Sequence, residues 1–154
     1  MTARLLVDIG NTRVKLAVAT AGRLAARQEL AWREPGFAER LSQVLAGLPA
    51  PARAVASCVA DEAVLAQVRA AVAERWACPL ERVQVRAEAA GLVNRYRDPA
   101  QLGVDRWLGA LGAWRRRRNA LCTIDCGTAL TVNVVSAQGE FLGVGEPVQL
   151  VVDQ

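Results

Sequence analysis

Histidine is absent from the sequence, and this absence limits the chemistry that the protein can perform. Zinc sites that combine cysteine with histidine are excluded, because they need an imidazole nitrogen as a ligand. Serine and cysteine nucleophiles that a histidine activates are excluded as well. Any general base must therefore be a carboxylate, a lysine or a tyrosine.

Lysine is almost absent, since Lys15 stands alone and 18 of the 19 basic residues are arginine. An ammonium is a compact point charge that suits a phosphate oxygen, whereas a guanidinium is planar and larger. The lone lysine therefore marks Lys15 as a candidate phosphate ligand, although chance alone also produces such a count.

The formal net charge is only +4, and much of it comes from the run Arg115–Arg118. This run invites nucleic-acid binding. It also ends an expected helix, where cations complement the helix dipole. We favour the solvated helix end and expect no nucleic-acid partner.

No apolar stretch reaches the roughly 18 residues of a membrane span. The N-terminus passes directly into an expected strand, so we expect no membrane segment and no signal peptide, and a cytoplasmic location. The scattered cysteines Cys58, Cys78, Cys122 and Cys126 predict buried, reduced thiols. A redox or metal pair of Cys122 and Cys126, four residues apart on one expected strand, is the less favoured alternative.

The stretch Leu5–Val18 predicts a buried strand, a tight polar turn and a returning strand. Asp8 alone interrupts the apolar run of a strand that we expect to be covered on both faces. The turn begins with Gly10, which tolerates positive φ, and Lys15 follows on the returning strand. A carboxylate, a turn rich in N–H groups and an ammonium suit a Mg²⁺-bound phosphate, with a plain β-hairpin as the alternative.

The stretch Leu121–Val132 repeats this layout of strand, Asp-x-Gly, hydroxyl-bearing turn and returning strand. We therefore expect Asp8 and Asp125 to face each other across a cleft. The 154 residues, 53% of them apolar, suit one domain, or one lobe and part of another.

The chain between the two hairpins predicts an α/β fold. The expected elements are a third strand at Arg23–Trp32 that completes a meander, a helix at Phe37–Leu48, a strand at Arg53–Val59, a helix capped by Asp61, and a parallel strand at Arg82–Arg86.

A further helix is expected from Asp98, as N-cap, and Pro99, at the first helical position, to about Arg117. Gly109 and Gly112 would let another element approach this helix closely. Asp105 and Arg106 place an acid beside a base in the first turns of this helix, and this pair, taken alone, indicates only a solvated surface.

Three motifs occur in order along the chain: Asp8-x-Gly10-Asn11-Thr12-x-x-Lys15, then Tyr96 with Gly103-x-Asp105-Arg106-Trp107, then Asp125-x-Gly127-Thr128-Ala129-x-Thr131. In this order and spacing they resemble type III pantothenate kinases, a family that includes the Bvg accessory factors. The resemblance covers roughly residues 3–143. It implies the superfold of acetate and sugar kinases, heat-shock chaperones and actin, in which two ribonuclease H-like lobes close over ATP. It also implies transfer of the γ-phosphoryl group of ATP to pantothenate, the first step of coenzyme A synthesis.

The resemblance further implies a role for each matching residue. Asp8 and Asp125 would hold or orient the Mg²⁺-bound phosphates. The first phosphate loop would be Gly10, Asn11, Thr12 and Lys15, and the second Gly127, Thr128, Ala129 and Thr131. Asp105 would be the general base, Arg106 would bind the pantothenate carboxylate, and Tyr96 and Gly103 would line that pocket. The family also implies a monovalent cation, K⁺ or NH₄⁺, and a homodimer.

The sequence departs from the family pattern after Gly139, where a Gly-Gly segment, a Pro-Gly turn and a whole second lobe are expected. We therefore expect a truncated chain, with residues 1–118 as the N-terminal lobe including the pantothenate-site helix and residues 119–154 as the start of the second lobe. Such a chain should bind ATP poorly and turn over little. A non-catalytic regulatory or binding protein of the Bvg accessory factor type is the alternative function.

Overall fold

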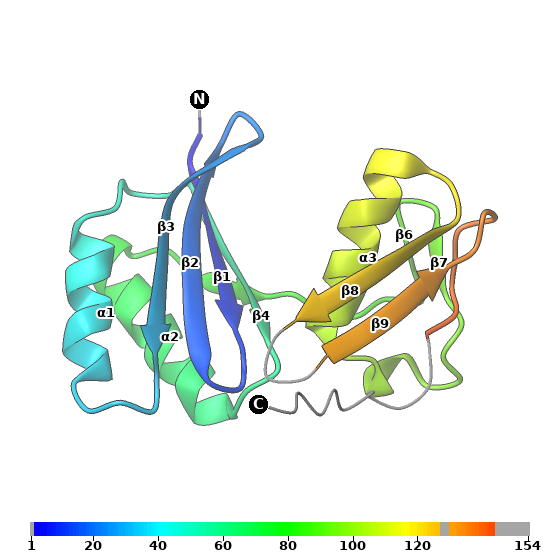
Figure 1. The fold of residues 1–154 in the computed structure, drawn as a ribbon. Helices are drawn as coiled ribbons and strands as arrows, with labels where there is room; N and C mark the ends of the chain where they lie inside the picture. The colour runs from blue at the N-terminus through cyan, green and yellow to red at the C-terminus, as the bar shows by residue number, and fades with distance from the viewer. Residues whose placement is uncertain (1, 127–129, 144–154) are drawn as a thin grey trace, which may run out of the picture. The chain divides into compact units, whose positions relative to one another are not determined.

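The computed structural model describes residues 2–126 and 130–143 (Figure 1). The chain forms two compact units, Met1–Val83 and Gln84–Gln154, and each has its own sheet and its own apolar core. The mixed α/β class predicted from the sequence is confirmed. None of the described helices is long and apolar enough to cross a membrane.

The first unit contains a five-stranded sheet in the order β3-β2-β1-β4-β5. Its strands are β1 (Arg4–Ile9), β2 (Arg13–Thr20), β3 (Arg23–Ala31), β4 (Arg53–Cys58) and β5 (Leu80–Arg82). The first three form the predicted antiparallel meander, while β4 runs parallel to β1 and β5 runs parallel to β4. The predicted strand–helix–strand unit with parallel strands is therefore confirmed.

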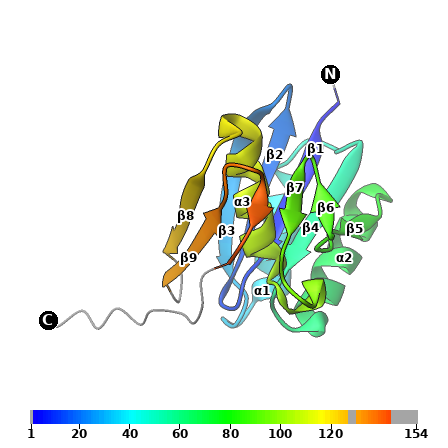
Figure 2. The ribbon, with the colours of Figure 1, turned by 90° about the vertical axis from the view of Figure 1, so that its right-hand side faces the viewer.

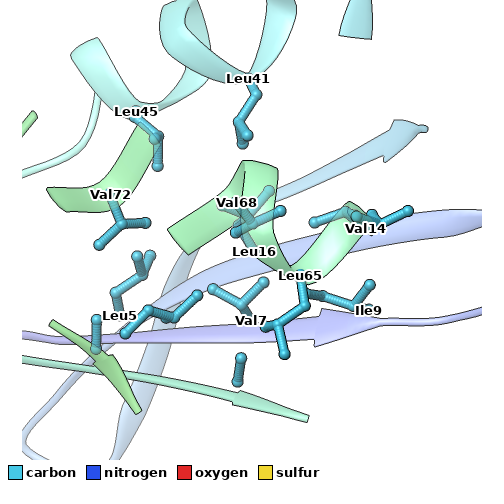
Figure 3. Packing of buried hydrophobic residues seen from close by; sticks show 14 of the residues in the cluster. Leu5, Val7, Ile9, Val14, Leu16, Leu41, Leu45, Leu65, Val68 and Val72 are labelled. Atoms are coloured by element: carbon cyan, nitrogen blue, oxygen red, sulfur yellow. The ribbon is translucent and has the colours of Figure 1, made fainter. Parts of the chain in front are cut away.

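Helices α1 (Phe37–Ala46) and α2 (Glu62–Trp76) supply the helical side of the first core. Figure 3 shows leucine and valine side chains of both helices meeting apolar side chains of β1 and β2. Leu5, Val7 and Ile9 alternate toward this core, whereas Leu6 and Asp8 between them are only half-buried. Within the first unit one face of β1 carries the core, and the expectation that β1 is covered on both faces stays a prediction.

The second unit contains a mixed sheet in the order β6-β7-β10-β9-β8. Its elements are β6 (Glu88–Ala89), β7 (Leu92–Asn94), the 3₁₀ turn η1 (Pro99–Gln101), α3 (Val104–Arg117), β8 (Leu121–Cys126), β9 (Leu130–Val135) and β10 (Glu140–Phe141). The predicted second hairpin is confirmed as β8 and β9 (Figure 2). Trp107 and Trp114 of α3 pack with Phe141 in this core, and the Trp107 and Phe141 rings meet edge to face at 6.2 Å between centroids.

Helix α3 packs against β8 and β9, so it belongs to the same compact unit as the second hairpin. The compact units therefore divide between Val83 and Gln84. The division of the family lobes expected between residues 118 and 119 stays a prediction.

The helix expected from Pro99 to Arg117 is interrupted. The Asp98 carboxylate does accept a hydrogen bond from the Ala100 N–H at 3.0 Å, but only the short turn η1 follows it. Leu102 and Gly103 then take extended backbone angles, and Leu102 is buried in the second core. The α-helix therefore begins only at Val104, because the backbone at Leu102 is extended and places this side chain in the second core.

Two smaller expectations also differ from the structure. The last strand of the first unit lies at Leu80–Arg82 and not at Arg82–Arg86, because Leu80 pairs with Ala54 and its side chain enters the first core. A Cβ atom added at Gly109 or Gly112 would meet no atom of another described element of the second unit within 4 Å, so no such element approaches these glycines closely.

The cysteines are all free, but only Cys58 is buried as predicted. Cys78 is half-buried, and Cys122 and Cys126 are exposed. Both exposed thiols lie on β8 beside Ile124, whose side chain is also 64% exposed. The prediction of buried thiols is wrong for Cys122 and Cys126, because no described residue covers this side of β8.

Candidate functional site

Asp8 lies in the middle of the first sheet, between two polar neighbours on adjacent strands. The strand register places Lys15 of β2 on one side of Asp8 and Ser57 of β4 on the other. The Ser57 hydroxyl donates a hydrogen bond to Asp8 Oδ1 at 2.7 Å. The carboxylate is thus held in place by a second strand, while it stays on the sheet side away from the first core.

The sequence analysis did not identify Ser57. Its relative exposure in the structure is only 8%. A hydroxyl next to Cys58 at the end of an apolar strand carried a signal, because parallel neighbouring strands bring such ends together. The register that pairs Ser57 with Asp8 could not be read from either strand alone.

The turn between β1 and β2 is closed by a hydrogen bond from the Gly10 N–H to the Arg13 carbonyl at 2.9 Å. Gly10 is not among the positive-φ glycines, and a Cβ atom there would sit 3.5 Å from the Arg13 oxygen, an ordinary contact. The turn therefore does not use the positive φ that a glycine tolerates. Asn11 and Thr12 are exposed, so their polar groups remain open to a ligand.

Trp32 fastens this turn from the end of the meander. Its indole Nε1–H donates to the Gly10 carbonyl at 2.9 Å, and its backbone N–H donates to the Thr12 carbonyl at 3.3 Å. Both bonds fix carbonyl groups of the candidate phosphate loop, which orients the loop's peptide planes. The sequence reasoning placed Trp32 only at the end of a strand and missed this contact.

A pocket of about 280 Å³ opens beside the turn within the first unit. It is lined by Asn11, Trp32, Arg33, Val59, Ala60, Asp61, Ala63 and Val64. Asp61 caps α2, since its Oδ1 accepts a hydrogen bond from the Ala63 N–H at 2.8 Å. The Arg33 guanidinium carbon lies 4.2 Å from the centroid of the Trp32 ring. The pocket therefore combines an aromatic wall with a cation next to the candidate loop.

Lys15 is exposed on β2, with Asp8 opposite it on β1 and Glu29 opposite it on β3. Glu29 forms an ion pair with Arg13, and Lys15 forms no ion pair with a described residue. The lone ammonium is thus free to meet an anion from solvent.

Asp105, Arg106 and Tyr96 come together in the second unit at the start of α3. Asp105 Oδ1 accepts a hydrogen bond from the Arg106 backbone N–H at 2.8 Å, which fixes the carboxylate at the helix N-terminus. The guanidinium carbon of Arg106 lies 5.9 Å from the Tyr96 ring centroid. A Cβ atom added at Gly103 would sit only 2.6 Å from Asp105 Oδ1, so Gly103 provides space for this carboxylate.

Asn133 and Thr123 complete this cluster, and the sequence reasoning missed both. The Arg106 Nε–H donates to Asn133 Oδ1 at 2.7 Å, and Asn133 Nδ2 donates to Thr123 Oγ1 at 3.3 Å. Asn133 is only 2% exposed, whereas Nη2 of Arg106 is buried without a hydrogen-bond partner among the described residues. An amide in the apolar strand Leu130–Val135 was the signal that could have identified Asn133.

Asp125 and Thr131 lie directly opposite each other on β8 and β9, and Asp125 is exposed. Gly127, Thr128 and Ala129 lie outside the described residues. The structure thus groups Asp8 with Lys15 in one unit, and Tyr96, Gly103, Asp105 and Arg106 in the other. That Asp8 and Asp125 face each other stays a prediction, because these residues belong to different units.

Among solved structures, the chain is similar to YeaZ from Pseudomonas aeruginosa, with a TM-score of 0.46 and 15% identity over 96% of this chain and 66% of that one. It is also similar to the ROK hexokinase from Thermus thermophilus, with a TM-score of 0.44 and 17% identity over 96% of this chain and 50% of that one.

Curated relatives match at higher identity. The type III pantothenate kinase of Alkalilimnicola ehrlichii is 38% identical over 140 residues, which are 90% of this chain and 56% of that protein. The type III pantothenate kinase of Paracidovorax citrulli is 40% identical over 146 residues, covering 90% of this chain and 57% of that protein. The chain spans about half the length of the curated relatives it matches.

A family model described as type III pantothenate kinase matches residues 4–145. This range contains both Asp-x-Gly hairpins and the cluster around Arg106. The chain therefore belongs to the type III pantothenate kinase family.

Proposed function

We propose that the chain carries the substrate residues of an ATP-dependent kinase that phosphorylates the hydroxyl of pantothenate, the first step of coenzyme A synthesis. Membership of the family over residues 4–145 supports the reaction. The observation that supports pantothenate as the acceptor substrate is the state of Arg106. Its buried Nη2 has no hydrogen-bond partner among the described residues. A carboxylate is the natural partner of such a group, and pantothenate has one.

Asp105 is the proposed general base. Its Oδ1 accepts a hydrogen bond from the Arg106 backbone N–H, so the carboxylate keeps one orientation next to the residue whose guanidinium would hold the substrate. In that position it would accept the proton of the pantothenate hydroxyl as the oxygen attacks the γ-phosphorus and the bond to the β-phosphate oxygen breaks. Without any histidine in the chain, a carboxylate is the simplest base available.

The phosphates of ATP are assigned to the two hairpins. Lys15 would bind a phosphate oxygen, and the exposed Asn11 and Thr12 would offer polar groups at the first turn. Thr131 would contribute its hydroxyl on the second hairpin together with Gly127, Thr128 and Ala129. Phosphoryl transfer depends mainly on such positioning and on charge stabilisation.

The donor set of the two hairpins fits a phosphate-bound Mg²⁺. Within residues 2–126 and 130–143, no three acidic or thiol side chains gather into a metal site made by protein alone. Mg²⁺ in phosphoryl-transfer sites keeps water ligands and takes one or two carboxylates, which Asp8 and Asp125 would supply. The ion would neutralise phosphate charge. The monovalent cation, the homodimer and the cytoplasmic location stay predictions, and no described feature favours the non-catalytic alternative.

Pantothenate binding by the purified chain tests the proposal, measured by isothermal titration calorimetry with ATP binding and phosphorylation measured in parallel. Arg106→Leu should weaken pantothenate binding by about tenfold or more, because it removes a charge-assisted hydrogen bond. Arg97→Leu is the matched control, since Arg97 is an exposed arginine of the same unit. Equal effects of the two substitutions, or no pantothenate binding by the unmodified chain, would contradict the proposal.

A further inference from the structure

The guanidinium of Arg106 is held from one side by an amide on a neighbouring strand. Asn133 Oδ1 accepts from Arg106 Nε at 2.7 Å, and because the guanidinium can only donate, the atom that faces it must be the amide oxygen. Asn133 Nδ2 in turn donates to Thr123 Oγ1 at 3.3 Å, and the strand register places Thr123 directly opposite Asn133. The amide is therefore fixed at both of its ends.

The neighbouring Nη2 group of the guanidinium is unused by the described residues. Nη2 of Arg106 is buried without a partner there, and no described carboxylate forms an ion pair with Arg106. The neighbouring Asp105 binds the Arg106 backbone N–H through Oδ1. A buried, charged donor without an acceptor is costly, so Nη2 of Arg106 is suited to an anion from outside the chain.

The chemical type of residue 133 matters as much as its place. An amide accepts the Nε–H bond but carries no charge, so the positive charge of Arg106 is not cancelled in the buried cluster. A carboxylate at this position would form a charge-assisted pair with Arg106 and compete with an anionic ligand for it.

We propose that Asn133 is a positioning residue that aims Arg106 at the carboxylate of the acceptor substrate and, being neutral, preserves the preference of the site for an anionic acceptor. This inference rests on the proposed function, since it takes pantothenate as the acceptor. It assigns Asn133 no contact with the reacting atoms.

Two ligands test this role: pantothenate, and pantothenyl alcohol, in which a hydroxymethyl group replaces the carboxylate. Their binding to the purified chain is measured by isothermal titration calorimetry. Asn133→Asp should weaken pantothenate binding by about tenfold or more and leave binding of the alcohol nearly unchanged, because only the carboxylate competes with the new charge. The ratio of the two affinities is the readout that a merely structural role would not move.

Two further variants distinguish the positioning role of Asn133 from an effect of lost folding. Thr123→Val keeps the shape but removes the oxygen that accepts from Asn133, so it should lower the affinity ratio in the same direction by a smaller factor. Val135→Ala is the matched control, because it opens space in the same strand and core without touching Arg106. It should leave the ratio unchanged. If Asn133→Asp does not fold, as judged by circular dichroism, the Thr123→Val ratio decides.

Equal weakening of both ligands in Asn133→Asp, or an unchanged ratio in the folded variants, would overturn the positioning role while leaving the proposed function intact. Failure of the unmodified chain to bind pantothenate would overturn the proposed function, and the role of Asn133 would fall with it. The two failures are therefore distinct.

Discussion

Asp105 and Arg106 are adjacent in the first turn of α3, yet their side chains have different surroundings. The Asp105 carboxylate is held by a backbone N–H, whereas the Arg106 guanidinium is held by Asn133 and leaves Nη2 unpaired among the described residues. One residue is thus arranged to accept a proton and the other to bind an anion. Substitutions at each should separate catalysis from binding.

Asp105→Asn should lower turnover by about 10²- to 10⁴-fold in any form of the protein that phosphorylates pantothenate, with a much smaller effect on pantothenate binding. The amide keeps the size of the carboxylate and can still accept the Arg106 N–H bond, but it cannot take a proton. Steady-state kinetics and calorimetry measure the two quantities. Asp98→Asn is the control, because asparagine caps the η1 turn as well as aspartate does. Unchanged turnover would remove Asp105 from the mechanism.

Lys15→Arg should weaken the use of ATP by about tenfold although the charge is kept, because a planar guanidinium cannot take the place of a compact ammonium. The apparent KM for ATP is the measurement. The reverse exchange Arg13→Lys on the same strand is the control, since Arg13 pairs with Glu29 and is not assigned to the phosphates. An equal apparent KM for ATP in Lys15→Arg and the parent protein would show that the single lysine at this position is a matter of chance.

At the scale of elements, the start of α3 depends on a glycine for space. Gly103 occupies the N-cap position without a side-chain cap, and Asp105 fills the volume where a Cβ atom would otherwise lie. Gly109, later in the same helix, has open space around it within the described part of the chain. Substitution by alanine should therefore disturb the Asp105 carboxylate at position 103 and be tolerated at position 109.

Gly103→Ala should lower turnover about tenfold to a hundredfold, because the new methyl group displaces the Asp105 carboxylate from its place. Gly109→Ala should leave turnover unchanged and raise the free energy of unfolding by about 0.5–1 kcal/mol, since alanine favours a helix interior. Kinetics and urea unfolding test the pair. A fully active Gly103→Ala variant would show that the carboxylate position is not critical.

Strands β4 and β5 are joined by an exposed ion pair between Arg53 and Glu81, with Arg53 Nε donating to Glu81 Oε1 at 3.0 Å. The hydrogen bond from Arg53 lowers the pKa of the Glu81 carboxyl and correspondingly raises the pKa of Arg53. A carboxyl pKa that is lower in the folded state than in the unfolded state contributes stability above its unfolded pKa. This contribution is lost as the pH falls through the folded pKa.

Glu81→Gln should therefore lower the melting temperature slightly at neutral pH and not at all in acid below the folded pKa of Glu81, where the carboxyl of the parent protein is protonated as well. The effect should be small, because exposed ion pairs contribute little. Arg53→Gln should show the same profile, and the double variant should lose no more than either single one. A difference that persists in acid would assign the effect to packing of the side chain and not to charge.

At the scale of the whole molecule, the first unit carries everything needed for a separate core. Its five strands and two helices enclose leucine and valine side chains with almost no exposed surface (Figure 3). The second unit has its own core around Trp107 and Phe141. Folding of the first unit should therefore not depend on the second.

Residues 1–83 expressed alone should unfold in one cooperative transition, followed by circular dichroism against urea. Leu65→Ala in this fragment should lower the free energy of unfolding by about 2–5 kcal/mol, because Leu65 is fully buried in α2. Gln67→Ala, exposed on the same helix, should change it little. A fragment without a cooperative transition would show that the first core needs the rest of the chain.

The sequence by itself determined the local features of this protein. Apolar runs on either side of a polar turn predicted the two hairpins, and side-chain caps predicted that helical segments start after Asp61 and Asp98. Such signals act within a few residues. The ordered motifs around Asp8, Asp105 and Asp125 also indicated the family. Local patterns could not foresee the break before Val104, where burial of Leu102 overrides helix continuity.

Only the tertiary structure decided which groups hold the candidate site residues. Ser57 binds Asp8 from 49 positions away, Trp32 binds Gly10 from 22 and Asn133 binds Arg106 from 27. Each contact depends on strand register and on packing between elements, which sum many weak interactions over the whole unit. The packing of α3 against β8 and β9 was decided in the same way. No sequence pattern within a single segment predicts such contacts, because the two partners meet only when the sheets have formed.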